Sequence, residues 1–281
     1  MAAGAGLSSD RRVESLDRRN RRTFGSVGVV DVYRRASGWL DAGERKMLSR
    51  IADETRGARI LDIGVGGGRT ASLLRLLTAS YVGIDYSPEM VRACLEDDGT
   101  LDVRLGDARD LSAFSDGEFK LVLFSYNGLD ALDHGDRARA VAEIHRVLEP
   151  CGLFLYCTTN KNGPNYGRRP WRAAPSPTPR TARRLLGALW ELPGSLPRHV
   201  RSYRNWRRAS RTAEDRGAWA IGPLHAHEYG LSIHFTLPST ERAMLGGFGF
   251  GLEEMLSMEG WPVVDDASTT KWFHVLARKG A

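Results

Sequence analysis

The sequence predicts an α/β fold in which a mostly parallel sheet carries helices on both faces. Short apolar segments alternate with amphipathic ones over residues 58–158, and a glycine-rich turn directly follows the first apolar segment. Such alternation produces strand–helix–strand units with parallel strands and right-handed crossovers. In sheets of this kind, ligands bind beyond the carboxyl ends of the strands. We therefore expect the functional residues at that edge.

Seven segments have the composition and length of strands. They are residues 58–63, 81–84, a short stretch around Val103, 119–124, 153–158, 251–258 and 271–277. Segments with helical spacing follow the first, second and fourth of these, and residues 27–55 show helical spacing before the first. The pattern predicts one seven-stranded domain over residues 27–281 with an N-terminal helical cap.

Two segments depart from this alternation. Residues 1–26 mix arginine with acidic residues and lack the apolar core of a secretory signal, which predicts a mobile polar arm. Residues 160–218 are rich in proline and arginine, which predicts a basic lid inserted after the fifth strand. Within them, residues 165–211 contain twelve Arg, no Lys and one acidic residue, a local charge of +11 in a chain of +6. The rest of the chain is therefore acidic, at about −5.

The bulk composition indicates a folded protein of a reducing compartment. At 281 residues and 42% hydrophobic content, the chain is long enough to bury a sizeable core. Its three cysteines, Cys94, Cys151 and Cys157, form neither a CxxC pair nor a disulfide pattern. No apolar run reaches the length of a membrane span. We therefore expect a cytoplasmic protein without a metal site.

The glycine-rich turn is the first candidate ligand site. Residues 60–70 read ILDIGVGGGRT, with Asp62 two residues before Gly64. Glycines let the backbone turn tightly and approach a ligand. The alternatives are a simple tight turn and a loop that binds a dinucleotide pyrophosphate. Because the carboxylate of Asp62 would repel a pyrophosphate but could hold an ammonium group, a methionine-type ligand is favoured.

Two more acidic residues follow the next strands. Asp85 comes 21 residues after Gly64, where a carboxylate can accept hydrogen bonds from both hydroxyls of a ribose. Nicotinamide-binding and adenosylmethionine-binding proteins share this device. Asp107 follows the third strand in RLGDARDL, where its carboxylate could accept from an adenine amino group, although helix capping is an alternative role.

Five motifs together resemble the class I S-adenosylmethionine-dependent methyltransferases, which have a Rossmann-like sheet. The motifs are ILDIGVGGGRT, VGIDYSPEMV, LGDARDL, FKLVLFSYNGLDAL and IHRVLEPCGLFLY, and the resemblance covers residues 27–159. It implies S-adenosyl-L-methionine as the cofactor. It also implies roles for individual residues: Gly64, Val65 and Gly66 beside the methionine portion, Asp85 on the ribose, Tyr86 on the adenine face, Asp107 and Ala108 at the adenine edge, Ser125 beside the methionine end, and Tyr33 in a helical lid.

Two details bear on the acceptor. The family usually has Pro-Gly-Gly before its fifth strand, whereas this chain has Pro150, Cys151 and Gly152, and we interpret Cys151 as a turn variant and not as a nucleophile. SYNGLD after the fourth strand lacks the Asn/Asp-Pro-Pro-Tyr signature of enzymes that methylate base amines or glutamine amides. FSYNGLDAL instead resembles a bacterial small-molecule subgroup. We therefore expect methyl transfer to an O or N nucleophile of a small acceptor.

The segment HEYGLSIH supplies the first candidate for a general base. His227 is preferred because an imidazole accepts protons near neutral pH, and Tyr126 and His134, after the fourth strand, are the next candidates. A structural role for such histidines is about equally common. A base is also dispensable in principle, since a sulfonium activates its methyl group and alignment supplies much of the rate.

The arginine-rich segment leaves several alternatives open. We favour a lid over an anionic acceptor, such as a phosphorylated or lipid-linked compound, because arginine forks suit phosphate. A peripheral membrane helix around residues 185–192 comes second, and an RNA-binding groove with aromatic stacking comes third. A solvated surface is the neutral alternative. A non-catalytic S-adenosylmethionine-binding protein and, more distantly, a nicotinamide oxidoreductase are the alternative functions.

Overall fold

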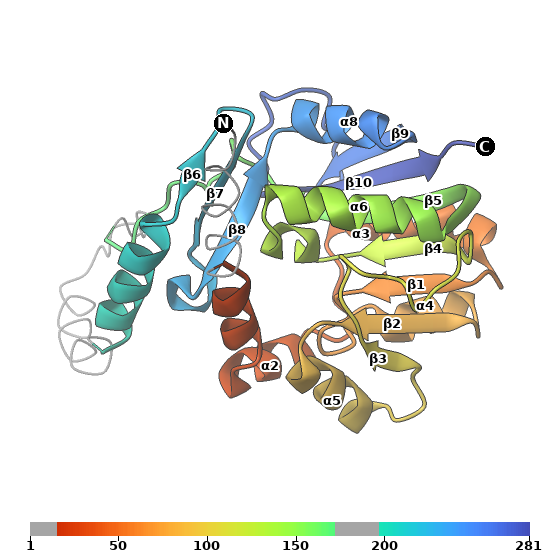
Figure 1. Cartoon of the computed structure of the whole chain (residues 1–281), viewed down its shortest axis with the longest axis horizontal. Helices are drawn as coiled ribbons and strands as arrows, with labels where there is room; N and C mark the ends of the chain where they lie inside the picture. The colour runs from red at the N-terminus through yellow and green to blue at the C-terminus, as the bar shows by residue number, and fades with distance from the viewer. Residues whose placement is uncertain (1–15, 172–196) are drawn as a thin grey trace, which may run out of the picture.

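A seven-stranded, mostly parallel sheet forms the centre of the molecule, as the sequence predicts (Figure 1). The computed structural model of the chain describes residues 16–171 and 197–281. The strand order is β3-β2-β1-β4-β5-β10-β9; the first five strands are parallel, and β10 runs antiparallel to both its neighbours. The strands are β1 (Ile60–Ile63), β2 (Tyr81–Asp85), β3 (Val103–Leu105), β4 (Phe119–Phe124), β5 (Leu148–Thr159), β9 (Phe250–Ser257) and β10 (Trp272–Lys279).

Helices cover both faces of this sheet because its central strands are apolar on both sides. On β4, Leu121 and Leu123 pack into one core cluster, and Val122 and Phe124 pack into the other. The first cluster includes α3 (Ala42–Thr55), α4 (Ala71–Leu77) and α5 (Pro88–Asp97). The second includes α6 (His134–Val147) and α8 (Pro238–Gly247). Within the described ranges, no helix is long and apolar enough to cross a membrane.

A second, smaller sheet lies beyond the carboxyl ends of the parallel strands (Figure 1). It consists of β6 (Glu214–Asp215), β7 (Trp219–Leu224) and β8 (Leu231–Thr236), all antiparallel, with the 3-10 turn η2 (Ala226–Tyr229) between β7 and β8. A bridge between Asn160 and Thr236 joins it to the end of β5. The predicted basic insertion thus contributes a helix over residues 197–210 and the strand β6. The predicted membrane helix at residues 185–192 lies outside the described residues.

The N-terminal cap consists of α2 (Val27–Arg34) and α3, preceded by a helical segment over residues 16–24. This segment was expected to belong to a mobile polar arm, and that expectation is wrong for residues 16–24. The side chain of Asn20 is buried, donates to Ser232 O at 2.8 Å and to Ala131 O at 3.0 Å, and accepts from Ser232 N at 3.1 Å. These bonds fasten the segment to β8 and to the loop after β4. Residues 1–15 lie outside the described part of the chain.

The loop after β4 is held by a buried ion cluster around Arg137 of α6. Arg137 is 1% exposed; it donates to Asp130 Oδ1 at 2.7 Å and to both carboxylate oxygens of Glu241 at 2.9 and 3.0 Å. Asp130, in the 3-10 turn η1 (Gly128–Ala131), also accepts from Thr158 Oγ1 and from the backbone N–H of Thr159, both at 2.6 Å. Through Asp130 the cluster joins this loop to the end of β5.

We predict that Arg137→Met destabilises the protein by about 3–5 kcal/mol, because it leaves two buried carboxylates without their counterion. Arg139→Met is the matched control, since Arg139 lies on the same helix with its side chain 67% exposed. The Arg139→Met variant should lose no more than about 1 kcal/mol of stability. Urea denaturation at pH 7 measures both, and equal losses in the two variants would contradict the structural role of the cluster.

Candidate functional site

The glycine-rich turn brings the first strand, the cap and the second strand together. Gly64, Gly66 and Gly68 all have positive φ, at +67°, +54° and +81°. A Cβ on Gly66 would lie 3.4 Å from the ring of Tyr33, and a Cβ on Gly67 would lie 2.7 Å from the backbone nitrogen of Arg34. The end of α2 therefore rests directly on the turn, which places Tyr33 over it.

Asp85, at the end of β2, ties the two neighbouring turns together. Its Oδ2 accepts the backbone N–H of Gly66 at 2.9 Å and its Oδ1 accepts that of Ser87 at 2.9 Å. The carboxyl is 5% exposed, and burial raises its pKa to about 6, against the opposing effect of the Ser87 and Gly66 hydrogen bonds. It is therefore ionised at pH 7. Each oxygen keeps lone-pair capacity for a further hydrogen bond.

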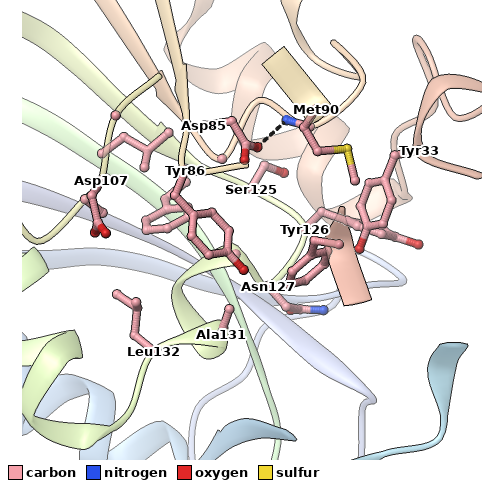
Figure 2. Close-up of a pocket in the computed structure, with 18 residues that line it drawn as sticks. Tyr33, Asp85, Tyr86, Met90, Asp107, Ser125, Tyr126, Asn127, Ala131 and Leu132 are labelled. Atoms are coloured by element: carbon pink, nitrogen blue, oxygen red, sulfur yellow. Dashed lines mark hydrogen bonds between the residues drawn. The ribbon is translucent and has the colours of Figure 1, made fainter. Parts of the chain in front are cut away.

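Gly64, Gly66 and Asp85 line a cavity of about 90 Å³ at the carboxyl ends of β1, β2 and β4, which we call the inner cavity (Figure 2). Most of the predicted cofactor residues lie on its wall. They are Tyr33, Gly64, Gly66, Asp85, Tyr86, Asp107, Ala108 and Ser125. The wall also contains Phe24, Met90 and Asn127, which sequence reasoning missed.

The wall formed by Tyr86 and Asp107 is supported by the helical segment of residues 16–24. The guanidinium of Arg21 lies 4.4 Å from the centre of the Tyr86 ring and donates to Tyr86 O at 3.0 Å and to Asp107 Oδ2 at 2.9 Å. Arg109 also donates to both oxygens of Asp107. The buried Oη of Tyr86 has no hydrogen-bond partner among the described residues. A ligand hydrogen bond would therefore satisfy a group that the folded chain leaves unpaired.

Asp62 and Val65 were predicted at the ligand, and the structure places neither on the inner cavity wall. Asp62 is 1% exposed and accepts from Thr70 Oγ1 at 2.7 Å and from Tyr81 Oη at 3.1 Å. Burial raises the pKa of its carboxyl to about 6, against the opposing effect of these two hydrogen bonds. The Val65 side chain packs in the core. Asp62 thus links the end of β1 to β2 through Tyr81 and to the start of α4 through Thr70, on the side of the glycine turn away from the inner cavity.

Ser125 is held by a buried ion pair that the sequence did not reveal. Arg69 donates to both oxygens of Glu44 at 2.8 and 2.7 Å, and the two side chains are 6% and 3% exposed. The Ser125 hydroxyl hydrogen-bonds to Arg69 and to Glu44. Because Glu44 is on α3 and Arg69 follows the glycine turn, the pair links the cap to the end of β4. Only the three-dimensional arrangement brings these charges together.

A second cavity, of about 270 Å³, adjoins the first, and we call it the middle cavity. It shares five wall residues with the inner cavity: Phe24, Tyr33, Tyr126, Asn127 and Ala131. Its other wall comes from β7, η2, β8 and the start of β10, including His225, His227, Lys271 and Trp272. Aromatic rings surround it, since Tyr126 packs edge-on against Tyr33, Trp39 and Trp272.

Left-handed backbone occurs in two runs of residues that contribute to the wall of the middle cavity. Tyr126 and Asn127 have φ of 51° and 59°, and His227 to Tyr229 have φ of 49°, 56° and 60°. Such conformations are costly for residues other than glycine and persist where the surrounding structure enforces them. Both runs aim side chains into the middle cavity, which supports its assignment as a functional site.

The three predicted catalytic residues have different surroundings. The imidazole of His227 packs against the ring of Tyr33, with centroids 5.9 Å apart, and burial lowers its pKa, so the ring is neutral at pH 7. Burial raises the pKa of the Tyr126 hydroxyl, which therefore keeps its proton. His134 stacks on Trp219 at 4.2 Å and meets His234 Nε2 through its Nδ1 at 3.2 Å, and it lines neither cavity. His134 is thus placed in a structural stack.

His225, which the sequence did not single out, also faces the middle cavity. Its buried Nδ1 has no hydrogen-bond partner in the described part of the chain. Burial lowers its pKa, and the charges of Arg168 and Lys271 lower it further. The neighbouring cations make it a poorer proton acceptor than His227 but leave its ring free to orient an acceptor.

Comparisons with known proteins agree with this geometry. Residues 60–152 match the family model described as a methyltransferase domain. The ubiquinone biosynthesis O-methyltransferase of Xanthomonas oryzae is 32% identical over 142 residues, which cover 45% of this chain and 58% of that protein. The chain thus matches little more than half the length of this relative.

Solved structures share the fold at low sequence identity. The CcbJ methyltransferase of Streptomyces caelestis superimposes with a TM-score of 0.57 at 16% identity, covering 92% of this chain and 98% of that one. The 1,6-didemethyltoxoflavin-N1-methyltransferase of Burkholderia thailandensis, solved with S-adenosylhomocysteine, has a TM-score of 0.51 at 15% identity and covers 86% and 80%. This chain therefore shares the Rossmann-like fold of these methyltransferases, and its residues 60–152 match the methyltransferase-domain model.

The chemical groups on the wall of the inner cavity suit S-adenosylmethionine. The Asp85 carboxylate is ionised, buried and able to accept further hydrogen bonds, as a ribose requires. The glycine turn brings bare backbone to the cavity wall, and the unpaired hydroxyl of Tyr86 faces it (Figure 2). The Asp107 oxygens are already engaged by two arginines, so its role at the adenine edge stays a prediction.

We predict that Asp85→Ala weakens binding of S-adenosylhomocysteine about 10–100-fold, because hydrogen bonds to a charged acceptor are lost. Asp53→Ala is the control, because the side chain of Asp53 lies on α3 and is 98% exposed. This variant should bind S-adenosylhomocysteine with unchanged affinity. Isothermal titration calorimetry measures both, with circular dichroism to check folding. Unchanged affinity in Asp85→Ala would refute the ribose assignment.

Proposed function

We propose that the protein transfers the methyl group of S-adenosylmethionine to a hydroxyl oxygen of a small aromatic acceptor bound in the middle cavity. The observation that carries the proposal is the shared wall: the cavity that fits the cofactor adjoins an aromatic cavity containing a neutral histidine. The curated relative reported above is named an O-methyltransferase, which supports an oxygen nucleophile.

The chain's own residues hold the reactants. Asp85 would bind the ribose hydroxyls, and Gly64, Gly66 and Ser125 would line the amino-acid end of the cofactor. When bound, S-adenosylmethionine supplies a methyl group that its sulfonium makes electrophilic. The rings of Tyr33 and Tyr126 lie on the wall common to both cavities, so they can align the acceptor and exclude water from the transfer.

His227 is the group best placed to take the acceptor's proton. Its ring lines the middle cavity, and burial keeps it unprotonated at neutral pH. Tyr126 keeps its own proton because its pKa is raised, so it can donate a hydrogen bond but cannot serve as a base near pH 7. His227 would therefore accept the proton, and Tyr126 would position the acceptor by donating a hydrogen bond.

Methyl transfer is tested by incubating the protein with S-adenosylmethionine and a panel of phenols and catechols and measuring released S-adenosylhomocysteine. We expect acceptor-dependent release with at least one hydroxylated aromatic compound. Cofactor binding without release from any acceptor would favour the non-catalytic alternative, and absence of cofactor binding would exclude both.

The pH profile tests the role of His227. A proton on the imidazole blocks acceptance of another, and burial lowers the pKa of His227. The value of kcat/KM should therefore fall at acid pH, with a midpoint below the ordinary pKa of histidine. His227→Ala should lower kcat about 100-fold or more, remove this acid limb and leave S-adenosylhomocysteine affinity unchanged.

His145→Ala is the matched control for this profile. His145 lies on α6 against Phe250, lines neither cavity, and also has a pKa lowered by burial. Its variant should keep both the rate and the acid limb. Persistence of the limb in His227→Ala would show that another group accepts the proton.

A further inference from the structure

Five arginines from two distant parts of the chain converge on one pocket. Arg19 and Arg22 come from the helical segment of residues 16–24, and Arg198, Arg201 and Arg208 come from the helix of residues 197–210. They line a hollow of about 920 Å³ beside η2, which we call the arginine pocket. The sequence assigned the first two to a free arm and the other three to a lid, so this convergence arises only on folding.

The charges of this pocket are not balanced within the described chain. Glu228 is its one acidic wall residue, and it pairs with Arg201 at 2.8 Å and with Arg198 at 3.4 Å. Arg19 donates to the neutral hydroxyl of Ser232 at 2.8 Å. Neither Arg22 nor Arg208 forms an ion pair within residues 16–171 and 197–281.

Arg19, Arg22 and Arg208 therefore line one pocket without an ion-pair partner among the described residues. Burial lowers the pKa of Arg19, and the charges of Arg22 and Arg208 lower it further. Like charges gathered on one pocket repel one another, and an anion bound between them would relieve that repulsion. Planar arginine forks match the oxygens of a phosphate, which can accept from several of them at once.

The arginine pocket adjoins the proposed acceptor site. His225, Ala226 and His227 line both the arginine pocket and the middle cavity. A molecule whose nucleophile lies beside His227 can therefore extend past η2 to the arginines. The wall of the middle cavity combines the rings of Tyr33, Tyr126 and Trp272 with polar groups that include Arg168 and Lys271, so the aromatic part of such a molecule would lie against the rings.

We propose that the arginine pocket binds a phosphate or diphosphate group of the methyl acceptor, through Arg19, Arg22 and Arg208. This inference rests on the proposed function, because it takes the middle cavity as the acceptor site. It narrows the substrate class to aromatic hydroxyl compounds that carry a phosphate or diphosphate at the end remote from the methylated oxygen.

The test uses inorganic pyrophosphate as the probe, titrated calorimetrically into the full-length protein at constant ionic strength. The variant Arg22→Gln/Arg208→Gln removes two exposed guanidinium groups of the pocket. The control Arg56→Gln/Arg104→Gln makes the same change in net charge at sites that are 62% and 53% exposed and outside the pocket. S-adenosylhomocysteine is titrated into every variant as a separate readout.

We expect pyrophosphate to bind the unmodified protein and the control equally, and Arg22→Gln/Arg208→Gln to lose about tenfold or more in affinity. Cofactor affinity should be unchanged in both variants. Equal pyrophosphate affinity in the two double variants would overturn the subsite. So would an absence of pyrophosphate binding alongside arginine-dependent retention on phosphatidylglycerol vesicles or single-stranded RNA.

The two proposals fail in different ways. If S-adenosylhomocysteine does not bind the unmodified protein, the proposed function falls, and the acceptor subsite falls with it. If S-adenosylhomocysteine binds but pyrophosphate does not, the proposed function stands and only the subsite is overturned.

Discussion

The carboxylate of Asp85 accepts a backbone N–H from Gly66 with one oxygen and from Ser87 with the other, and so joins the turns that follow β1 and β2. The inner cavity depends on this link, because the end of α2 packs directly on the glycine turn and Tyr33 is part of α2. Asp85 is thus both a structural tie and the expected ribose ligand. Its buried charge is tolerated because the hydrogen bonds that fix the turns also stabilise the ionised form.

Two buried ion clusters fix the loop after β4, where the cavities meet. Glu44 and Arg69 hold Ser125 from the side of the cap, and Arg137 holds Asp130 from the side of α6. Between them the backbone of Tyr126 and Asn127 is forced into the left-handed region. Buried ion pairs add little net stability compared with apolar packing, but they penalise every other arrangement of the loop. Here that specificity places Tyr126 on the wall common to the inner and middle cavities.

The three cavities differ in chemistry along one path. The inner cavity presents backbone and a carboxylate. The middle cavity presents aromatic rings and a neutral imidazole beside two cations, and the arginine pocket presents five arginines, of which two pair with Glu228. A linear acceptor would meet ring packing and proton acceptance in the middle cavity and anion binding in the arginine pocket. The nucleic-acid and membrane alternatives use only the last of these, so they leave the aromatic cavity and His227 unexplained.

The sequence by itself determined the sheet, the glycine turn and the positions of Asp85 and Tyr86, because these depend on neighbouring residues and on strand ends. It assigned Asp62 to the ligand, but the tertiary partners Thr70 and Tyr81 hold that carboxylate behind the turn. The sequence also proposed His134 as a base, whereas in the structure its ring stacks on Trp219 and its Nδ1 contacts His234. Only the folded chain brings Arg22 beside Arg208. Which polar groups face a cavity is decided by contacts between distant residues, and those contacts leave no local pattern.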